Sequence, residues 1–149
     1  GYLFFTRPNA ISCVLRIGNG RATALLAGDI ERLQEAALLE RLPERLRADV
    51  LLVPHHGSKT SSSAAFLDAG RPRIGLVQAG YRNRFGHPVP EVVARHAERD
   101  VRLVENVRCG AALWSSASPA EVGCERERER RYWQHRPAAL RSVGVKTVN

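Results

Sequence analysis

Residues 49–57 read Asp-Val-Leu-Leu-Val-Pro-His-His-Gly, and this stretch decides the fold class. The continuous apolar run before Pro54 is typical of a short strand that is buried on both faces, as in a parallel sheet. A similar run at residues 73–78 predicts a second buried strand. The two histidines directly after Pro54 therefore lie in a loop that leaves a buried strand.

Alternating strands and helices surround this stretch. The predicted elements are a hairpin formed by residues 13–17 and 22–27, helices at 31–47, 61–69 and 90–99, and strands at 101–104 and 111–114. Asn19-Gly20 marks the hairpin, because these residues readily adopt the positive φ angles of a tight turn. In the first helix apolar residues recur at helical spacing from Leu33 onward, and Pro43 is expected to break or kink it. The chain is therefore predicted to be α/β with a mixed sheet.

Composition fits one globular domain. The chain has 149 residues, of which 44% are hydrophobic and 26% charged, which excludes a disordered or fibrous protein. No apolar run approaches the roughly 18 to 20 residues of a membrane span, so we expect this stretch of chain to be soluble. The formal net charge is +8, and all basic residues except Lys59 and Lys146 are arginines. A polyanionic partner fits that charge, and so does a GC-rich coding bias.

The cysteines give no framework. Cys13, Cys109 and Cys124 are odd in number and show no C-x-x-C spacing, so neither a zinc knuckle nor a disulfide framework is predicted. Cys13 and Cys109 lie in apolar stretches and are expected to be small core residues.

Polar clusters follow three of the predicted strands. They are Asp29, residues 55–59 and residues 83–87. Loops at the ends of neighbouring strands meet at one edge of an α/β sheet, so these clusters are expected to converge. Asp29 also precedes a helix, and a helix N-cap is the alternative interpretation of this residue.

Adjacent histidines with an aspartate indicate a metal site. In an extended segment neighbouring side chains point to opposite faces, so one histidine could bind a metal while the other contacts it indirectly or contacts the substrate. Such ligands suit zinc or manganese. Because catalytic zinc commonly has three protein ligands, the site either recruits His87 or lacks a part.

Four motifs in this order resemble one family. They are residues 9–17, 25–31, 53–61 and 83–88, which include Leu-Ala-Gly-Asp at 26–29 and Pro-His-His-Gly-Ser-Lys at 54–59. Together they are similar to the C-terminal metallo-β-lactamase-like domain of ComEC-type competence proteins, which are bacterial membrane proteins that import DNA in natural transformation. The resemblance implies an αββα sandwich with a divalent metal centre, zinc or manganese and two ions when complete.

The resemblance also implies roles for individual residues. Asp29 corresponds to a metal-bridging aspartate, and His55 and His56 to the last metal-ligand motif. Which histidine binds metal stays open, with a preference for His56 and with His55 beside the substrate phosphate. The residues expected to line the site and contact phosphates are Ser58, Lys59, Asn83, Arg84 and His87.

The upstream half of the site is expected outside this chain. Nothing here resembles the H-x-H-x-D-H motif of the first half of that fold, so residues 1–118 are interpreted as the C-terminal part of the domain and residues 119–149 as a charged extension. The isolated chain is expected to be inactive. Its expected partners are the upstream half, the membrane channel of the parent protein and DNA, with single-stranded DNA preferred, on the periplasmic side of the inner membrane.

Three functions remain as alternatives. The first is metal-assisted hydrolysis of DNA phosphodiesters. The second is hydrolysis of another substrate on the same fold, and the third is a non-catalytic module that binds DNA or docks on the channel. Because only 6% of residues are aromatic, contact with the DNA backbone is expected rather than base stacking.

Overall fold

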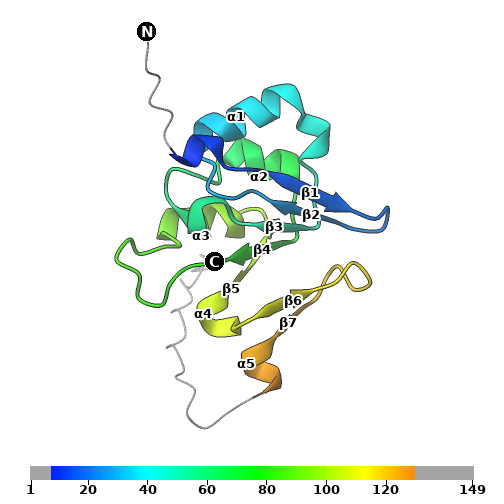
Figure 1. Cartoon of the computed structure of the whole chain (residues 1–149), viewed down its shortest axis with the longest axis vertical. Helices are drawn as coiled ribbons and strands as arrows, with labels where there is room; N and C mark the ends of the chain where they lie inside the picture. Colours follow the sequence, from blue (N-terminus) through cyan, green and yellow to red (C-terminus); the bar gives the residue numbers. More distant parts are fainter. Residues whose placement is uncertain (1–7, 130–149) are drawn as a thin grey trace, which may run out of the picture.

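A computed structural model describes residues 8–129, which form an α/β fold around a mixed sheet (Figure 1). The sheet has five strands in the order β1-β2-β3-β4-β5. Their bounds are Leu15–Gly18, Thr23–Leu26, Val50–Leu52, Ile74–Val77 and Arg102–Glu105. The pair β1 and β2 is antiparallel, and β2 to β5 run parallel. The α/β class and the mixed sheet are thus confirmed, whereas the αββα sandwich stays a prediction.

The predicted hairpin is present. Gly20 has a φ of +81°, and the side-chain oxygen of Asn19 accepts hydrogen bonds from the backbone N–H groups of Arg21 and Ala22 at 3.1 and 3.2 Å. Asn19 therefore closes the turn with its side chain, in the way that favours asparagine in turns.

Three helices connect the parallel strands. They are α1 (Arg32–Arg41), α2 (Ala64–Gly70) and α3 (Pro90–Ala97). The predicted 31–47 helix ends at Arg41, and a short 3-10 helix, Pro43–Arg45, follows, because proline cannot continue an α-helix. Each helix crosses between neighbouring parallel strands in the same direction along the sheet, so right-handed connections place all three on one face. There Leu25 and Leu51 pack with Phe66 and Leu67 of α2.

The helix α1 buries a charge where an apolar stripe was predicted. Leu33 is 81% exposed, whereas Glu35 is fully buried. The Glu35 carboxylate accepts hydrogen bonds from the backbone N–H groups of Ser62 and Ser63 at 2.5 and 2.8 Å. The prediction that Leu33 belongs to the core was wrong, because the first turn of α1 is fixed by this polar tie to the start of α2.

The opposite face of the sheet carries a row of aliphatic side chains. Partners in the register place five residues side by side across the strands: Leu15, Leu26, Leu52, Leu76 and Val104. Leu15 is 53% exposed, and the other four are partly exposed. The described residues therefore leave this apolar row incompletely covered.

The C-terminal part corrects the cysteine prediction. Strands β6 (Ala112–Trp114) and β7 (Val122–Cys124) form a separate antiparallel pair between the short helices α4 (Asn106–Cys109) and α5 (Glu125–Arg128). Cys109 and Cys124 are joined by a disulfide, while Cys13 is exposed. Spacing could not reveal this bond, because it depends on how the hairpin pairs.

Two further sequence predictions concern this region. The 118/119 boundary falls inside the β6–β7 hairpin, and the charge block at 125–131 begins as α5, with its last two residues outside the described range. Within residues 8–129 no helix is both long and apolar enough to cross a membrane.

His96 on α3 is a buried histidine whose surroundings favour the uncharged form of the imidazole. Its side chain is fully buried, and burial lowers the pKa of the imidazole, with smaller contributions from the positive charges of Arg95 and Arg99. The Nδ1–H donates to the carbonyl oxygen of Val92 at 2.8 Å, and this bond partly offsets the effect of burial. Nε2 has no hydrogen-bond partner among the described residues.

This burial predicts a loss of stability in acid. Because the pKa of His96 is lower in the folded chain than the ordinary value of 6.5, protons bind preferentially to the unfolded chain below that value. The free energy of unfolding should be level above about pH 6.5 and fall below it, by at most about 1.4 kcal/mol per pH unit from this group. Urea denaturation from pH 5 to 8 should show this slope, and His96→Leu should reduce it. An unchanged slope in the variant would contradict this origin.

Candidate metal centre and substrate loop

The end of β3 makes an unusual turn. His55, His56 and Gly57 have φ angles of +49°, +57° and +81°, so three consecutive residues lie in the left-handed region. Residues other than glycine rarely adopt this conformation, and they do so where the surrounding structure imposes it, often at functional sites.

Three contacts hold the turn. The backbone N–H of His55 donates to the carbonyl oxygen of Gly28 at 2.9 Å, which ties the turn to the end of β2. The carbonyl oxygen of Gly57 accepts from Val89 at 3.0 Å. A Cβ on Gly57 would lie 2.6 Å from the Cβ of Pro88. The turn is thus fixed between the β2 end and the loop before α3.

The turn directs His56 toward Asp29. Nε2 of His56 lies 3.6 Å from Oδ1 of Asp29, and both side chains are about half exposed, at 50% and 43%. Nδ1 of His56 lies 2.6 Å from the carbonyl oxygen of Gln78 and donates its proton there, which leaves Nε2 as the free nitrogen. A carbonyl on the far ring nitrogen is the usual support of a metal-binding histidine.

His55 points to a different set of groups. Its Nδ1 lies 3.4 Å from the Glu31 carboxylate and 3.4 Å from the Thr60 hydroxyl, and its Nε2 lies 3.3 Å from the amide nitrogen of Asn9. Glu31 also accepts from Asn9 and Thr60. His55 therefore belongs to a network of neutral and acidic side chains that differs from the partners of His56.

Asn9, Glu31 and Thr60 were not assigned roles from the sequence. They lie within the motifs that carry the resemblance, but none is of a type that stands out alone. The alternative interpretation of Asp29 as a helix N-cap was wrong, because Glu31 occupies that position. The N-cap of α1 is Glu31, whose N–H is bonded to the side chain of Gln34 at 3.1 Å, so Asp29 is not the cap.

The predicted substrate residues are placed unequally. Ser58 is buried, and its hydroxyl contacts that of Thr60 at 3.1 Å. Asn83 uses its side chain within its own loop, accepting from His87 N–H and donating to the carbonyl oxygens of Gly80 and His87. Lys59 lines a hollow together with Glu31 and Thr60, the two residues that contact Nδ1 of His55. Of the predicted set, Ser58 and Asn83 have their polar atoms engaged inside the protein.

The loop of residues 81–88 brings His87 and aromatic rings to the site. The rings of His87 and His55 are 6.0 Å apart, and His87 stacks on Phe85 at 5.6 Å. Arg84 lies over the Phe85 ring at 4.7 Å, and Arg82 over Tyr81 at 5.3 Å. Phe85 is 63% exposed and Tyr81 49%. Phe85 therefore reaches the site through His87, whereas Tyr81 contacts Arg82 of the same loop.

The surroundings of His87 lower the pKa of its imidazole. Partial burial is the largest cause, and the nearby imidazoles of His55 and His56 lower the pKa further.

Asp29 and His56 form a pair of candidate ligands, yet within residues 8–129 no three histidine, cysteine or acidic side chains are close enough together to hold a metal. His87 does not complete such a group.

The chain is similar in sequence to several known bacterial proteins. The chain is 35% identical over 130 residues to competence protein ComA of Neisseria gonorrhoeae, which covers 87% of this chain and 19% of that protein. It is 36% identical over 101 residues to ComE operon protein 3 of Bacillus subtilis (66% of this chain, 13% of that protein) and 37% identical over 98 residues to recombination protein 2 of Haemophilus influenzae (66% and 12%). No family model matches the chain.

These similarities place the chain among competence proteins. More particularly, the chain belongs to the ComEC-type competence family, as its motifs predicted. It spans about a fifth or less of the length of the relatives it matches.

The turn leads to a stability prediction. Gly57→Ala adds a Cβ at 2.6 Å from that of Pro88 and at a φ of +81°, so both crowding and backbone strain oppose it. We expect unfolding in urea to require about 1 to 3 kcal/mol less free energy. Gly20→Ala is the matched control, because it has the same φ of +81° and nothing within 4 Å of the added Cβ. Equal losses in the two variants would show that the contact with Pro88 does not matter.

Proposed function

We propose that this chain supplies one half of a metal-dependent centre that hydrolyses DNA phosphodiesters in a competence protein. The observation that carries the proposal is the pair Asp29 and His56, with the two candidate ligand atoms 3.6 Å apart and His56 oriented by Gln78. Membership of the competence family, and the name competence protein ComA of one relative, support a role in natural transformation.

The donor set fits a divalent ion. Zinc bonds to histidine nitrogen and carboxylate oxygen are each about 2.1 Å, so Nε2 of His56 and Oδ1 of Asp29 can reach a common ion across the gap. The nitrogen and oxygen ligands suit zinc or manganese. Other ligands would come from the upstream half of the domain. The bound metal would activate a water molecule and stabilise charge on the phosphate.

The residues of this chain would position the substrate. His56 and Asp29 would hold the metal, while His55 is kept in place by Glu31 and Thr60, with its ring 6.3 Å from that of His56 and 6.0 Å from that of His87. Arg84 would contact a phosphate through its fork of N–H donors. Phe85 and Tyr81 would stack on unpaired bases, which favours a single strand over a duplex.

The incompletely covered sheet face supports the upstream half as a partner. The row from Leu15 to Val104 is aliphatic in all five strands and is only partly shielded by the described residues. A second layer packed here would bury that row and, because the row lies at the end of the strands nearest Asp29, would approach the metal ligands.

The disulfide supports a location outside the cytoplasm. Disulfides persist in oxidising compartments such as the periplasm and are rare in the cytosol. The bond between Cys109 and Cys124 is therefore consistent with a domain of an inner-membrane protein that faces the periplasm. The membrane channel of the parent would be its neighbour there.

The central test is cleavage by the complete domain. With manganese or zinc, we expect it to cut a labelled single-stranded oligonucleotide, and Asp29→Asn and His56→Gln each to lower turnover at least about 100-fold because each removes a ligand. Binding of the oligonucleotide should change less than about threefold. Glu40→Gln, an exposed carboxylate on α1, is the control.

Other outcomes favour the alternatives. No cleavage with either metal, together with oligonucleotide binding that is unaffected by Asp29→Asn, would indicate a non-catalytic module that binds DNA. The lack of a three-ligand group in residues 8–129 is the observation that keeps this alternative. Cleavage of a small phosphodiester without cleavage of DNA would instead indicate another hydrolase on the same fold.

A second test concerns the loop. Phe85→Ala should weaken binding of a single-stranded oligonucleotide to the chain in EDTA by roughly 5- to 100-fold, since base stacking on one aromatic contributes about 1 to 3 kcal/mol. Leu113→Ala is a suitable control, because Leu113 is 51% exposed on β6, outside the loop. Fluorescence anisotropy measures both. An equal loss of duplex binding would argue against stacking on unpaired bases.

A further inference from the structure

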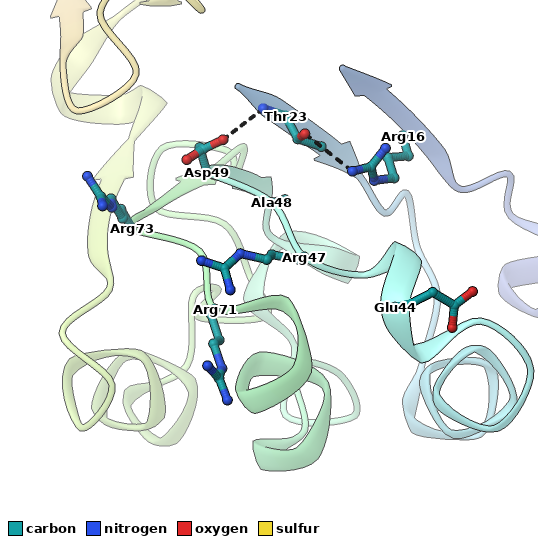
Figure 2. Close-up of a pocket in the computed structure, with 8 residues that line it drawn as sticks. All are labelled: Arg16, Thr23, Glu44, Arg47, Ala48, Asp49, Arg71 and Arg73. Atoms are coloured by element: carbon teal, nitrogen blue, oxygen red, sulfur yellow. Dashed lines mark hydrogen bonds between the residues drawn. The ribbon is translucent and has the colours of Figure 1, made fainter. Parts of the chain in front are cut away.

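A cluster of arginines lies where the parallel strands begin, at the opposite end of the strands from the candidate metal centre. A hollow of about 210 Å³ is found there, lined by Arg16, Thr23, Glu44, Arg47, Ala48, Asp49, Arg71 and Arg73 (Figure 2). Asp29 and His56 follow the ends of β2 and β3, so the sheet separates the hollow from the candidate metal centre.

The hollow has an excess of positive charge. Four arginines line it against two carboxylates. One of these, Asp49, already accepts a hydrogen bond from the N–H of Thr23 at 2.8 Å. Within the described part of the chain, none of the four arginines forms an ion pair with a carboxylate. The hollow therefore carries uncompensated positive charge that can attract an anion.

The backbone fixes two of these arginines in place. Arg71 has a φ of +44° at the C-cap of α2, and its N–H donates to the carbonyl oxygen of Leu67 at 2.8 Å. The N–H of Arg73 donates to the carbonyl oxygen of Asp49 at 3.0 Å. The backbone at both residues is therefore already ordered, so ligand binding restricts only the side chains and costs less entropy than ordering a loop would.

Two guanidinium groups are free to bind. Arg16 donates to the Thr23 hydroxyl at 3.4 Å and Arg71 to the carbonyl oxygen of Asp68 at 3.2 Å. Arg47 and Arg73 are exposed and make no side-chain hydrogen bond within residues 8–129. Figure 2 shows Arg47, Arg71 and Arg73 on one side of the hollow, with Arg16 and Glu44 on the other.

We propose that this hollow binds phosphate groups of a nucleic-acid strand as a second contact, remote from the metal centre. Guanidinium forks match phosphate oxygens, and the lining contains no aromatic side chain, so the contact is with the backbone and independent of sequence. The choice of a nucleic acid rests on the proposed function. At about 3.3 Å per residue, the extended residues 49 to 53 alone span roughly 13 Å, and His56 follows in the turn beyond them, so only a strand several nucleotides long reaches both sites.

The test is binding by the full chain in EDTA, where cleavage does not interfere. The double variant Arg47→Gln/Arg73→Gln should raise the Kd for a labelled 20-nucleotide strand at least about 10-fold in anisotropy measurements. The slope of log Kd against log salt should fall by about 1.4, or about 0.7 for each lost phosphate contact. The control Arg41→Gln/Arg128→Gln removes the same charge at exposed arginines outside the hollow and should change the Kd less than about threefold.

Several outcomes would overturn the proposal. Equal loss of affinity in the two double variants would show that only net charge matters. If Arg47→Gln/Arg73→Gln bound the strand normally but lost binding to vesicles containing an anionic phospholipid, the hollow would serve a lipid surface instead. Urea denaturation of both variants checks that they fold. Because the assay has no metal, its failure leaves cleavage by the complete domain standing, and failure of cleavage leaves this binding site standing.

Discussion

The candidate site depends on the left-handed turn at the end of β3. A strand that simply ended at Pro54 would let the next residues run on toward solvent. Three consecutive positive φ angles reverse the chain instead, and hydrogen bonds to Gly28 and Val89 attach the reversed segment to its neighbours. As a result the ends of β2 and β4 and the loop before α3 meet around two histidines, although they are far apart in the sequence.

Polar contacts rather than apolar packing hold the segment that follows the turn. The hydroxyl of Ser61 donates to the carbonyl oxygen of Pro54 at 2.8 Å, and Glu35 binds the next two backbone N–H groups. Arg95 donates to the carbonyl oxygens of Ser61 and Ser62 at 3.2 and 2.6 Å. Buried backbone groups need such partners, and the helices α1 and α3 provide them from both sides. The helix layer thus supports the site as well as the core.

The sequence predicted the elements that have a strong local signal. The Asn-Gly hairpin, the buried strands β3 and β4, the three helices and the α/β class all follow from turn chemistry and apolar runs. The phase of α1 did not, because periodicity treats Leu33 as core and Glu35 as surface, whereas a tertiary hydrogen-bond pair decides which side faces inward. β7 and its disulfide depend on pairing between distant residues, which composition cannot show.

The convergence of the polar clusters was predictable from the sequence, and the geometry of the candidate site was not. Clusters after strand ends identified Asp29, the two histidines and the loop of residues 83–87. Which histidine faces Asp29 depends on the positive φ angles of His55 and His56. Histidine does not by itself favour such angles, so the sequence could not predict the direction of either ring. The buried hydroxyl of Ser58 and the engaged amide of Asn83 show that proximity in sequence to a site does not make a side chain available to a ligand.

The bond between Cys109 and Cys124 turns the β6–β7 hairpin into a closed covalent ring. A protease that cut one peptide bond between those cysteines would open the loop without releasing anything, because residues after Cys124 would stay attached through sulfur. The strand pair and α5 could therefore survive a nick at the exposed tip of the hairpin. In a compartment rich in proteases, this would protect the connection between the sheet and the C-terminal segment.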